Sequence, residues 1–306
     1  MQTAGGLLVA GAFLVEFLTG GAHRPLSALT AAPERVPLDV TGATVDRWSR
    51  GGGVPLVLVH GYAPQGKDDP RVQEAAALLA RAGFDVAVPT IPGLTRGRLR
   101  PDDVRPVVAT LAARSRPTVM IGVSVGAGPA LLAAAEPAVR ARVRTVLTLG
   151  GYASAPELLR FFLTGDYAWD GVRGRVVHEP AVVRAFIEAN ADLLDTPARD
   201  ALADPRRAAA ILAQPPPRVA DLLARLSPER VAREISARLV LVHGVDDPAV
   251  PYTESLRLAA ARPERTRLVL VHVLEHVEAG RRGPRLAALR EFAALLLVVY
   301  GLAHPA

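Results

Sequence analysis

One serine of this sequence stands in a setting that favours nucleophilic chemistry. Residues 122–126 read Gly-Val-Ser-Val-Gly, so Ser124 lies in a G-x-S-x-G motif directly after an apolar run at residues 118–123. Small residues follow at 126–130, as is required where a strand turns sharply into a helix, because bulky side chains would collide there. A serine in such a turn presents its hydroxyl to a carbonyl carbon. The alternative is a turn that only packs a helix tightly onto a sheet.

A second motif, His-Gly-Tyr at residues 60–62, follows an apolar run at residues 54–59. Ligands of parallel sheets bind at the carboxyl ends of the strands, so this loop is expected to face the same crevice as the serine. The backbone amides of Tyr62 and Val125 are then candidates for an oxyanion hole, which stabilises the charge that develops on a substrate oxygen. His60 precedes the serine in the chain, and we interpret it as a residue that packs the loop.

An acid that can orient a base occurs towards the end of the chain. Residues 243–251 read His-Gly-Val-Asp-Asp-Pro-Ala-Val-Pro and follow an apolar run at residues 239–242. A carboxylate at a strand end can accept a hydrogen bond from a histidine ring, fix its tautomer and stabilise its protonated form. Two acids compete for this role. We favour Asp247 and interpret Asp246 as a turn residue.

Two histidines near residue 275 are candidates for the base. His272 lies inside the alternating apolar run 267–273 and is expected to belong to a strand. His276 follows that run, on a loop before the final helix, where a mobile imidazole can meet the serine. We therefore favour His276 as the base, with a chain order of serine, aspartate and histidine.

The composition fits a protein built of helices and a parallel sheet. Half of the 306 residues are hydrophobic while only 5% are aromatic, so Ala, Val and Leu supply the core. The net charge of +6 comes almost wholly from arginines scattered among acids, since Lys67 is the only lysine. This pattern indicates a solvated surface, and no nucleic-acid partner is expected. Without cysteine there are no disulfides or thiol nucleophiles, and the histidine spacing suggests no metal site.

Strand and helix patterns alternate along most of the chain, which predicts an α/β fold with a parallel sheet covered by helices on both faces. A hairpin is expected first, from the two short alternating runs at 36–40 and 43–48. Further strands are expected at 54–59, 84–88, 118–123, 144–149, 239–242 and 267–273, and helices at 70–82, 102–114, 126–136 and 284–300.

The alternation of strand and helix patterns stops between residues 152 and 236. This segment has a helical pattern throughout and is too long for a simple connection. We interpret it as a helical cap inserted into a core made of residues 36–151 and 237–306. Its aromatic residues are expected to form an apolar wall that prefers uncharged esters with short to medium chains, or else only to pack the cap. They are Phe161, Phe162, Tyr167 and Trp169.

The N-terminal segment, residues 1–35, contains an apolar stretch at 5–18 that is interrupted only by Glu16. A spanning helix needs about 20 apolar residues, and a secretory signal needs a positively charged start, so neither fits. The two interpretations are association with a membrane and a helix packed on the domain surface. If the stretch inserts, Arg24 and Arg35 follow it, and the positive-inside tendency favours a cytoplasmic location of the body.

The ordered set of motifs around Ser124, Asp247 and His276 resembles the α/β-hydrolase superfamily, whose members commonly carry a His-Gly loop, a G-x-S-x-G elbow and an H-G-x-x-D-x-x-V-P turn. The resemblance covers about 36–151 and 237–306. It implies an eight-stranded sheet and hydrolysis of an ester, thioester or amide of a small molecule through an acyl-enzyme, without a cofactor. An acyltransferase or peptidase with the same triad, and a binding protein without turnover, are the alternatives; the oligomeric state is open.

Overall fold

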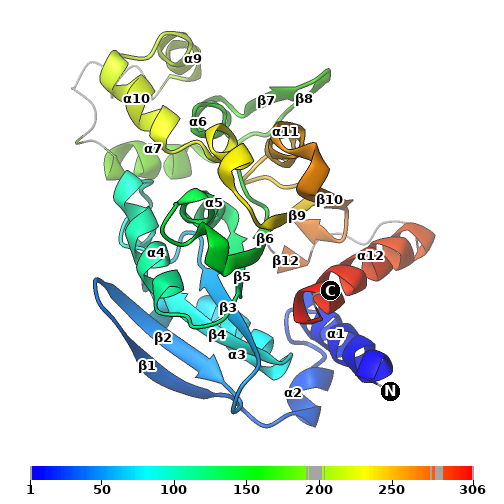
Figure 1. The fold of residues 1–306 in the computed structure, drawn as a ribbon. Helices are drawn as coiled ribbons and strands as arrows, with labels where there is room; N and C mark the ends of the chain where they lie inside the picture. Colours follow the sequence, from blue (N-terminus) through cyan, green and yellow to red (C-terminus); the bar gives the residue numbers. More distant parts are fainter. Residues whose placement is uncertain are drawn as a thin grey trace.

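The structure is a computed structural model, and its description covers residues 2–190, 192, 202, 204–275, 278–279 and 285–304. Figure 1 shows a central sheet with helices on both sides, and a group of helices gathered at one end of it.

Eight strands form the central sheet, in the order β1-β2-β4-β3-β5-β6-β9-β10. Strand β2 pairs antiparallel with β1 on one side and with β4 on the other, and every other neighbouring pair is parallel. The predicted fold class and the eight strands implied by the resemblance are therefore confirmed. The strands are β1 (Glu34–Val40), β2 (Ala43–Ser49), β3 (Val54–Val59), β4 (Phe84–Pro89), β5 (Thr118–Val123), β6 (Val143–Leu149), β9 (Arg238–Gly244) and β10 (Thr266–Val271).

Helices cover the two faces of the sheet and create two apolar cores. One face packs against α4 (Val104–Ala112), α5 (Ala127–Ala135) and α11 (Thr253–Ala261), and the other against α1 (Gln2–Leu18), α3 (Pro70–Arg81) and α12 (Arg285–Ala303). Helix α3 begins where the sequence predicts, because the Asp69 carboxylate accepts a hydrogen bond from the Arg71 amide (3.0 Å) and Pro70 occupies the first turn.

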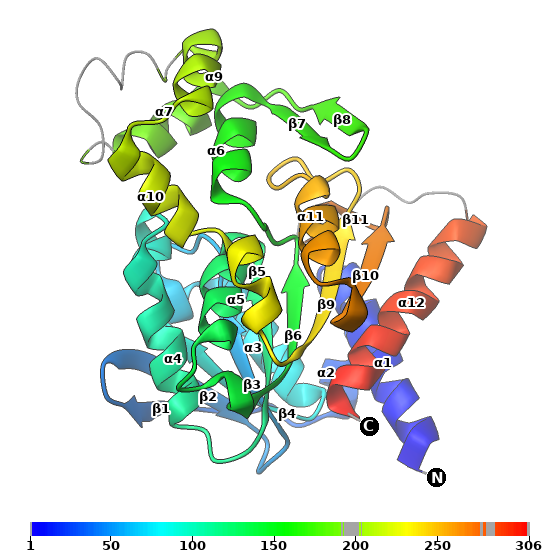
Figure 2. The same ribbon diagram turned by 45° about the horizontal axis from the view of Figure 1, so that its top comes forward.

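The N-terminal segment folds as α1 followed by the short α2 (Pro25–Leu29). Helix α1 runs antiparallel along α12, since Gly6 lies against His304 and Gly11 against Leu296, and Figures 1 and 2 show the two helices side by side. Glu16, the only charged residue of α1, turns inward and accepts hydrogen bonds from the amide and hydroxyl of Ser27. In the described part of the chain, no helix has the length and hydropathy to cross a membrane.

Between β6 and β9 the chain leaves the sheet and forms the inserted segment, residues 150–237, which lies beyond the carboxyl ends of the strands (Figure 2). A hairpin stands among its helices, in a region where the sequence predicts no strand. Its described elements are α6 (Ala155–Thr164), β7 (Asp166–Trp169), β8 (Val172–Arg175), α7 (Pro180–Ala189), α9 (Pro205–Ala213) and α10 (Pro217–Arg225). A separate two-stranded ladder, β11 (Leu274–Glu275) and β12 (Glu278–Ala279), follows β10.

The two ends of the inserted segment are joined by buried hydrogen bonds. The Tyr152 hydroxyl donates to the Leu226 carbonyl (3.0 Å), and the Ala155 amide donates to the Ser227 hydroxyl (3.0 Å). Glu254 of α11 accepts from the amides of residues 153 and 154 (3.0 and 2.7 Å). These contacts fix the entry and exit of the segment relative to the core.

Candidate active site

Ser124 stands in a tight turn between β5 and α5. Its φ of 53° lies in the left-handed region, which only Ser124 and Asp170 adopt among the described residues other than glycine. Such a conformation costs of order 1–3 kcal/mol and persists only where the surroundings hold it. They do so here through two close approaches. A Cβ at Gly122 would lie 2.7 Å from Ala127 Cα, and one at Gly126 would lie 2.2 Å from the His60 carbonyl oxygen. The spacing of the G-x-S-x-G motif therefore has a steric cause.

The loop after β3 reaches the serine. A Cβ at Gly61 would lie 3.1 Å from the Ser124 Cβ, so the backbone that leads into Tyr62 passes directly beside the nucleophile candidate. His60 is buried, donates from Nδ1 to the Gly61 carbonyl (2.7 Å) and accepts at Nε2 from the Ile91 amide (3.0 Å). Burial lowers the pKa of His60, which keeps the ring neutral in this role. His60 thus holds the loop, as predicted.

The acid turn after β9 separates its two aspartates. Asp246 is exposed, whereas Asp247 is buried, and its Oδ1 accepts hydrogen bonds from the amides of Ala249 and Val250 (2.8 and 2.9 Å). Ala249 and Val250 line the same cavity as the serine. The two aspartates therefore differ in burial: the turn holds Asp247 in the interior and leaves Asp246 at the surface.

His243 supports this turn, a role that the motif alone does not reveal. The ring is fully buried, accepts at Nδ1 from the Ser255 hydroxyl (2.7 Å) and donates from Nε2 to the Val250 carbonyl (2.9 Å). The same Nε2 lies 3.3 Å from Asp247 Oδ2. His243 therefore supports the turn that carries Asp247. Both of its ring nitrogens are engaged in these contacts, so neither is available for catalysis.

Of the two candidate bases, His276 lies outside the described residues. His272 is described, and its predicted place inside a strand is wrong. Strand β10 ends at Val271, and Glu291 of α12 accepts hydrogen bonds from the amides of His272 and Val273 (2.9 and 3.0 Å), which withdraws them from the ladder. The His272 ring is exposed, with Nδ1 3.0 Å from a Glu291 oxygen. Nothing in this arrangement directs it towards the serine.

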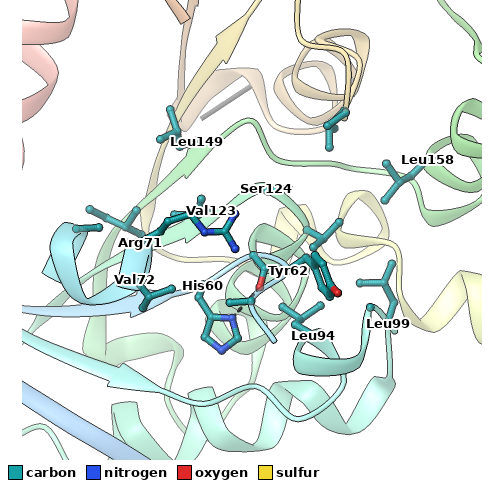
Figure 3. Close-up of a pocket in the computed structure, with 18 of the residues that line it drawn as sticks. His60, Tyr62, Arg71, Val72, Leu94, Leu99, Val123, Ser124, Leu149 and Leu158 are labelled. Atoms are coloured by element: carbon teal, nitrogen blue, oxygen red, sulfur yellow. Dashed lines mark hydrogen bonds between the residues drawn. The ribbon is translucent and has the colours of Figure 1, made fainter. Parts of the chain in front are cut away.

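A cavity of about 2000 Å³ lies against Ser124. Figure 3 shows Val72, Val123 and Leu149 on one side of the serine, and Leu94 and Leu99 on the other, next to the exposed side chain of Tyr62. Most of the lining is aliphatic. The site therefore places a serine hydroxyl beside a largely apolar cavity.

The predicted aromatic wall is only partly present. Phe162 lines the cavity together with Phe186. Phe161 is fully buried between Tyr167 and His178. The ring of Trp169 stacks with the Arg257 guanidinium, whose carbon lies 4.1 Å from the ring centroid. Phe161, Tyr167 and Trp169 are therefore not among the described residues that line the cavity. Adjacent residues of a helix point about 100° apart, so α6 turns Phe161 away, and the β7–β8 hairpin carries the other two towards α11.

The residues of α6 that line the cavity follow a helical period and are mostly aliphatic, so the aromatic residues of the sequence do not reveal them. These side chains recur at intervals of three and four residues, which is the pattern of one helix face. They are Ala155, Leu158, Leu159, Phe162 and Leu163.

Arginines also reach the cavity, which the sequence motifs did not indicate. Arg98, from the loop after β4, pairs with Asp192 of the inserted segment, and Arg100 pairs with the same carboxylate at 3.2 Å. Arg71 of α3 pairs with Asp69 at 3.1 Å. Each of these three cations faces an acid, but Arg98 and Arg100 share one, and further arginines also line the cavity.

Comparisons with known proteins bear on the fold. No curated protein matches the sequence. Similar solved structures include a meta-cleavage product hydrolase from Pseudomonas fluorescens, with 17% identity and a TM-score of 0.50 over 89% of this chain and 99% of the other. Two peptidases are also similar over 90% of this chain: the Pyrococcus horikoshii acylaminoacyl peptidase (11% identity, TM-score 0.56) and a puromycin-hydrolysing peptidase of Mycobacterium tuberculosis (19%, 0.54). This chain spans only 41% and 40% of those two chains.

At such low sequence identities, the structural similarity is evidence for the fold alone. A family model described as the alpha/beta hydrolase family matches residues 56–295, which is well over half of the sequence and includes the serine turn and the acid turn. The chain therefore belongs to the alpha/beta hydrolase family.

Proposed function

We propose that this hydrolase cleaves carboxylic esters through an acyl-enzyme formed on Ser124. The observation that carries the proposal is the left-handed turn at Ser124, beside the Gly61 loop and above an apolar cavity. Asp247, buried and fixed by two amides, is the orienting acid. His276 is the base, assigned by its place in the chain.

The reaction proceeds in two acyl transfers. His276 takes the proton of the Ser124 hydroxyl while the oxygen attacks the ester carbonyl, and the amides of Tyr62 and Val125 stabilise the resulting oxyanion. His276 then returns the proton to the leaving alcohol. Water repeats the sequence on the acyl-enzyme, which releases the carboxylic acid and restores the serine.

An uncharged ester suits the cavity better than a charged or strongly polar substrate. Burying an unpaired charge against aliphatic side chains is unfavourable, and most residues that line the cavity are aliphatic. A peptidase or acyltransferase would use the same residues, and a binding protein would use only the cavity. The similar structures are named as an acylaminoacyl peptidase and a meta-cleavage product hydrolase, so these alternatives have to be separated by experiment.

Labelling with a fluorophosphonate tests the nucleophile. The wild-type protein is expected to be labelled, and Ser124→Ala is expected to lose both labelling and about three orders of magnitude of ester turnover with its fold intact. Ser236→Ala, at an exposed serine, is the matched control and should behave as wild type. Undiminished labelling of Ser124→Ala would overturn the assignment. Faster cleavage of peptide amides than of nitrophenyl esters would favour a peptidase, and acyl transfer to added alcohols in preference to water would favour an acyltransferase.

We also propose that α1 and α12 contact a membrane surface. Large apolar side chains project into solvent from these two adjoining helices: Leu7 and Leu8 on α1 are 38% and 75% exposed, and Leu289 and Leu297 on α12 are 65% and 53% exposed. The inward turn of Glu16 leaves the outer side of α1 without a charged side chain. Such helices can lie in the interfacial region of a bilayer.

A further inference from the structure

The two faces of the sheet differ in how completely they are covered. On the face below α4 and α5, Val57, Met120 and Val146 are 0% exposed. On the opposite face, below α1 and α12, Ile121 and Leu147 each retain 7% and line the cavity. Interior strands of a parallel sheet are normally sealed on both faces. Leu56 and Val119 on the same face are 0% exposed, so the helices stand away from the strands only in the part of the face nearer to Ser124.

The lining residues form a path from the serine along this face. Val123 of β5 pairs with Leu149 of β6, and both residues are half-buried. Two residues earlier on each strand, Ile121 pairs with Leu147 and also lines the cavity. Two residues along a strand cover about 6.6 Å. The path therefore begins next to Ser124 and leads towards the amino ends of the strands. We call this part of the cavity the sheet-side arm.

Helices supply the opposite wall of the sheet-side arm. Side chains from three elements that are distant in sequence face the strands across it. They are Phe13, Leu14 and Phe17 of α1; Val72, Ala75 and Leu78 of α3; and Leu295, Val298, Val299 and Leu302 of α12.

The polar groups that line the sheet-side arm either have hydrogen-bond or ion-pair partners or lie at its margin. Glu16 accepts two hydrogen bonds from Ser27, and Arg24 and Glu74 form an exposed pair at 3.8 Å. Arg71 pairs with Asp69 at the end nearest the serine. The interior of the arm is aliphatic and aromatic, so an occupant needs no hydrogen-bonding groups there.

Volume distinguishes between possible occupants. Small-molecule sites usually measure about 300–1,000 Å³. The cavity of about 2000 Å³, which comprises the sheet-side arm and the space beneath the inserted segment, exceeds that range, and the short to medium esters suggested by the sequence would leave part of its apolar lining without contacts. Empty apolar space forfeits dispersion contacts, whereas a flexible alkyl chain can restore them.

We propose that the sheet-side arm binds a long aliphatic acyl chain, so that the preferred substrates are long-chain esters. This inference rests on the proposed esterase function and adds its substrate class. The carbonyl carbon sits at Ser124, the acyl chain runs over Val123 and Ile121 beneath α1 and α12, and the alcohol leaves on the side of the inserted segment.

Chain-length profiles test the proposal. Nitrophenyl esters from acetate to palmitate are compared at concentrations below micelle formation, and kcat/KM is expected to rise with acyl length by up to about fourfold per methylene, which corresponds to ~0.8 kcal/mol per buried CH₂. Val299→Trp on α12 and Ala75→Phe on α3 narrow the arm from different helices. Each should lower kcat/KM for laurate and palmitate esters at least tenfold while acetate and butyrate esters change less than twofold.

Leu297→Trp is the matched control, because Leu297 lies on the same helix as Val299 but points into solvent. Its chain-length profile should equal that of the wild type. Unchanged short-ester turnover in the two narrowing variants shows that they are folded, and the melting temperature provides a second check.

Binding without turnover separates this inference from the proposed function. The Ser124→Ala protein is titrated with the fluorescent fatty acid cis-parinaric acid, which is expected to bind one to one and to be displaced by palmitate. Adding Val299→Trp should weaken that binding at least tenfold, and adding Leu297→Trp should not.

The outcomes point to different conclusions. Efficient short-ester cleavage with a flat chain-length profile and no effect of the narrowing variants would overturn the long-chain inference and leave the esterase intact. Fatty-acid binding in the arm by a protein that cleaves no ester would support the binding site and overturn the esterase.

Discussion

At the scale of single residues, the local geometry of each motif has a steric or hydrogen-bonding cause that can be read from the sequence. Gly122 and Gly126 permit the turn that holds Ser124, and the acid turn buries Asp247 while Asp246 faces solvent. Side chains without such local causes were assigned less well. Phe161 and Trp169 carry no motif, and their surroundings depend on a hairpin that the sequence did not reveal.

The two histidines give the sharpest prediction at this scale. His276→Ala should lower kcat by about two to four orders of magnitude at neutral pH, because it removes the proposed general base. His272→Ala should retain activity and lose about 1 kcal/mol of stability, since it removes only the pairing of an exposed imidazole with Glu291, whose carboxylate keeps its hydrogen bonds from the amides of residues 272 and 273. Steady-state kinetics and urea unfolding of both variants measure these effects. If His272→Ala were inactive but stable while His276→Ala stayed active, His272 would be the base in place of His276.

At the scale of elements, the buried strands were the most predictable part of the fold. Each is a continuous apolar run, and the observed limits of β3 and β5 equal the predicted ones. The β7–β8 hairpin escaped prediction because its strands have four residues each and little alternation. The sheet-side arm was equally hidden, since a buried strand reads as apolar on both faces, and only the distance of α1 and α12 decides which face is sealed.

Glu254 links α11 to the start of the inserted segment and makes stability depend on pH. Burial raises the pKa of this carboxyl from 4.5 to about 7, although the amides of residues 153 and 154 and the nearby Arg257 oppose the shift. The folded state therefore retains a proton that the unfolded chain releases above about pH 4.5. Stability from this group is fully present below that pH and falls as the pH rises towards 7, by on the order of 3 kcal/mol.

Glu254→Gln should remove this component, because a neutral amide oxygen can still accept from both backbone amides. Urea unfolding at pH 5 and pH 8 measures it: the wild-type protein should lose more stability between the two values than Glu254→Gln. Glu157→Gln, at a half-buried acid 3.8 Å from Arg257, is the control and should keep the wild-type difference. Equal pH dependence in wild type and Glu254→Gln would contradict the prediction.

At the scale of the whole molecule, α1 and α12 form one side of the protein, where the first and last helices of the described chain meet (Figure 1). The sequence predicted an apolar N-terminal stretch and offered two interpretations for it. The structure shows the packed helix. The proposed contact with a membrane concerns the outer surface of the same pair.

Flotation with lipid vesicles tests that contact. The wild-type protein is expected to float with phosphatidylcholine vesicles, and more strongly when phosphatidylserine is added, because the net charge is +6. The double variant Leu8→Glu and Leu297→Glu should reduce the bound fraction at least tenfold, since each glutamate places a charge on the apolar outer side. Val177→Glu, at a residue 91% exposed on the inserted segment, is the control and should bind as wild type. Absence of wild-type flotation with either lipid would refute the proposal.

The two walls of the cavity differ in how readily evolution or engineering can exchange them. The inserted segment belongs to the single crossover connection between β6 and β9, which are neighbouring parallel strands, and its two ends are held together by the hydrogen bond between Tyr152 and Leu226. One contiguous stretch of gene can therefore be lengthened, shortened or replaced without shifting any strand register, and selectivity on the alcohol side is free to diversify by recombination. The sheet-side wall is assembled from α1, α3 and α12, which lie far apart in the gene. It can change only by substitutions that remain compatible with one another across the whole length of the chain, and it should therefore evolve more slowly.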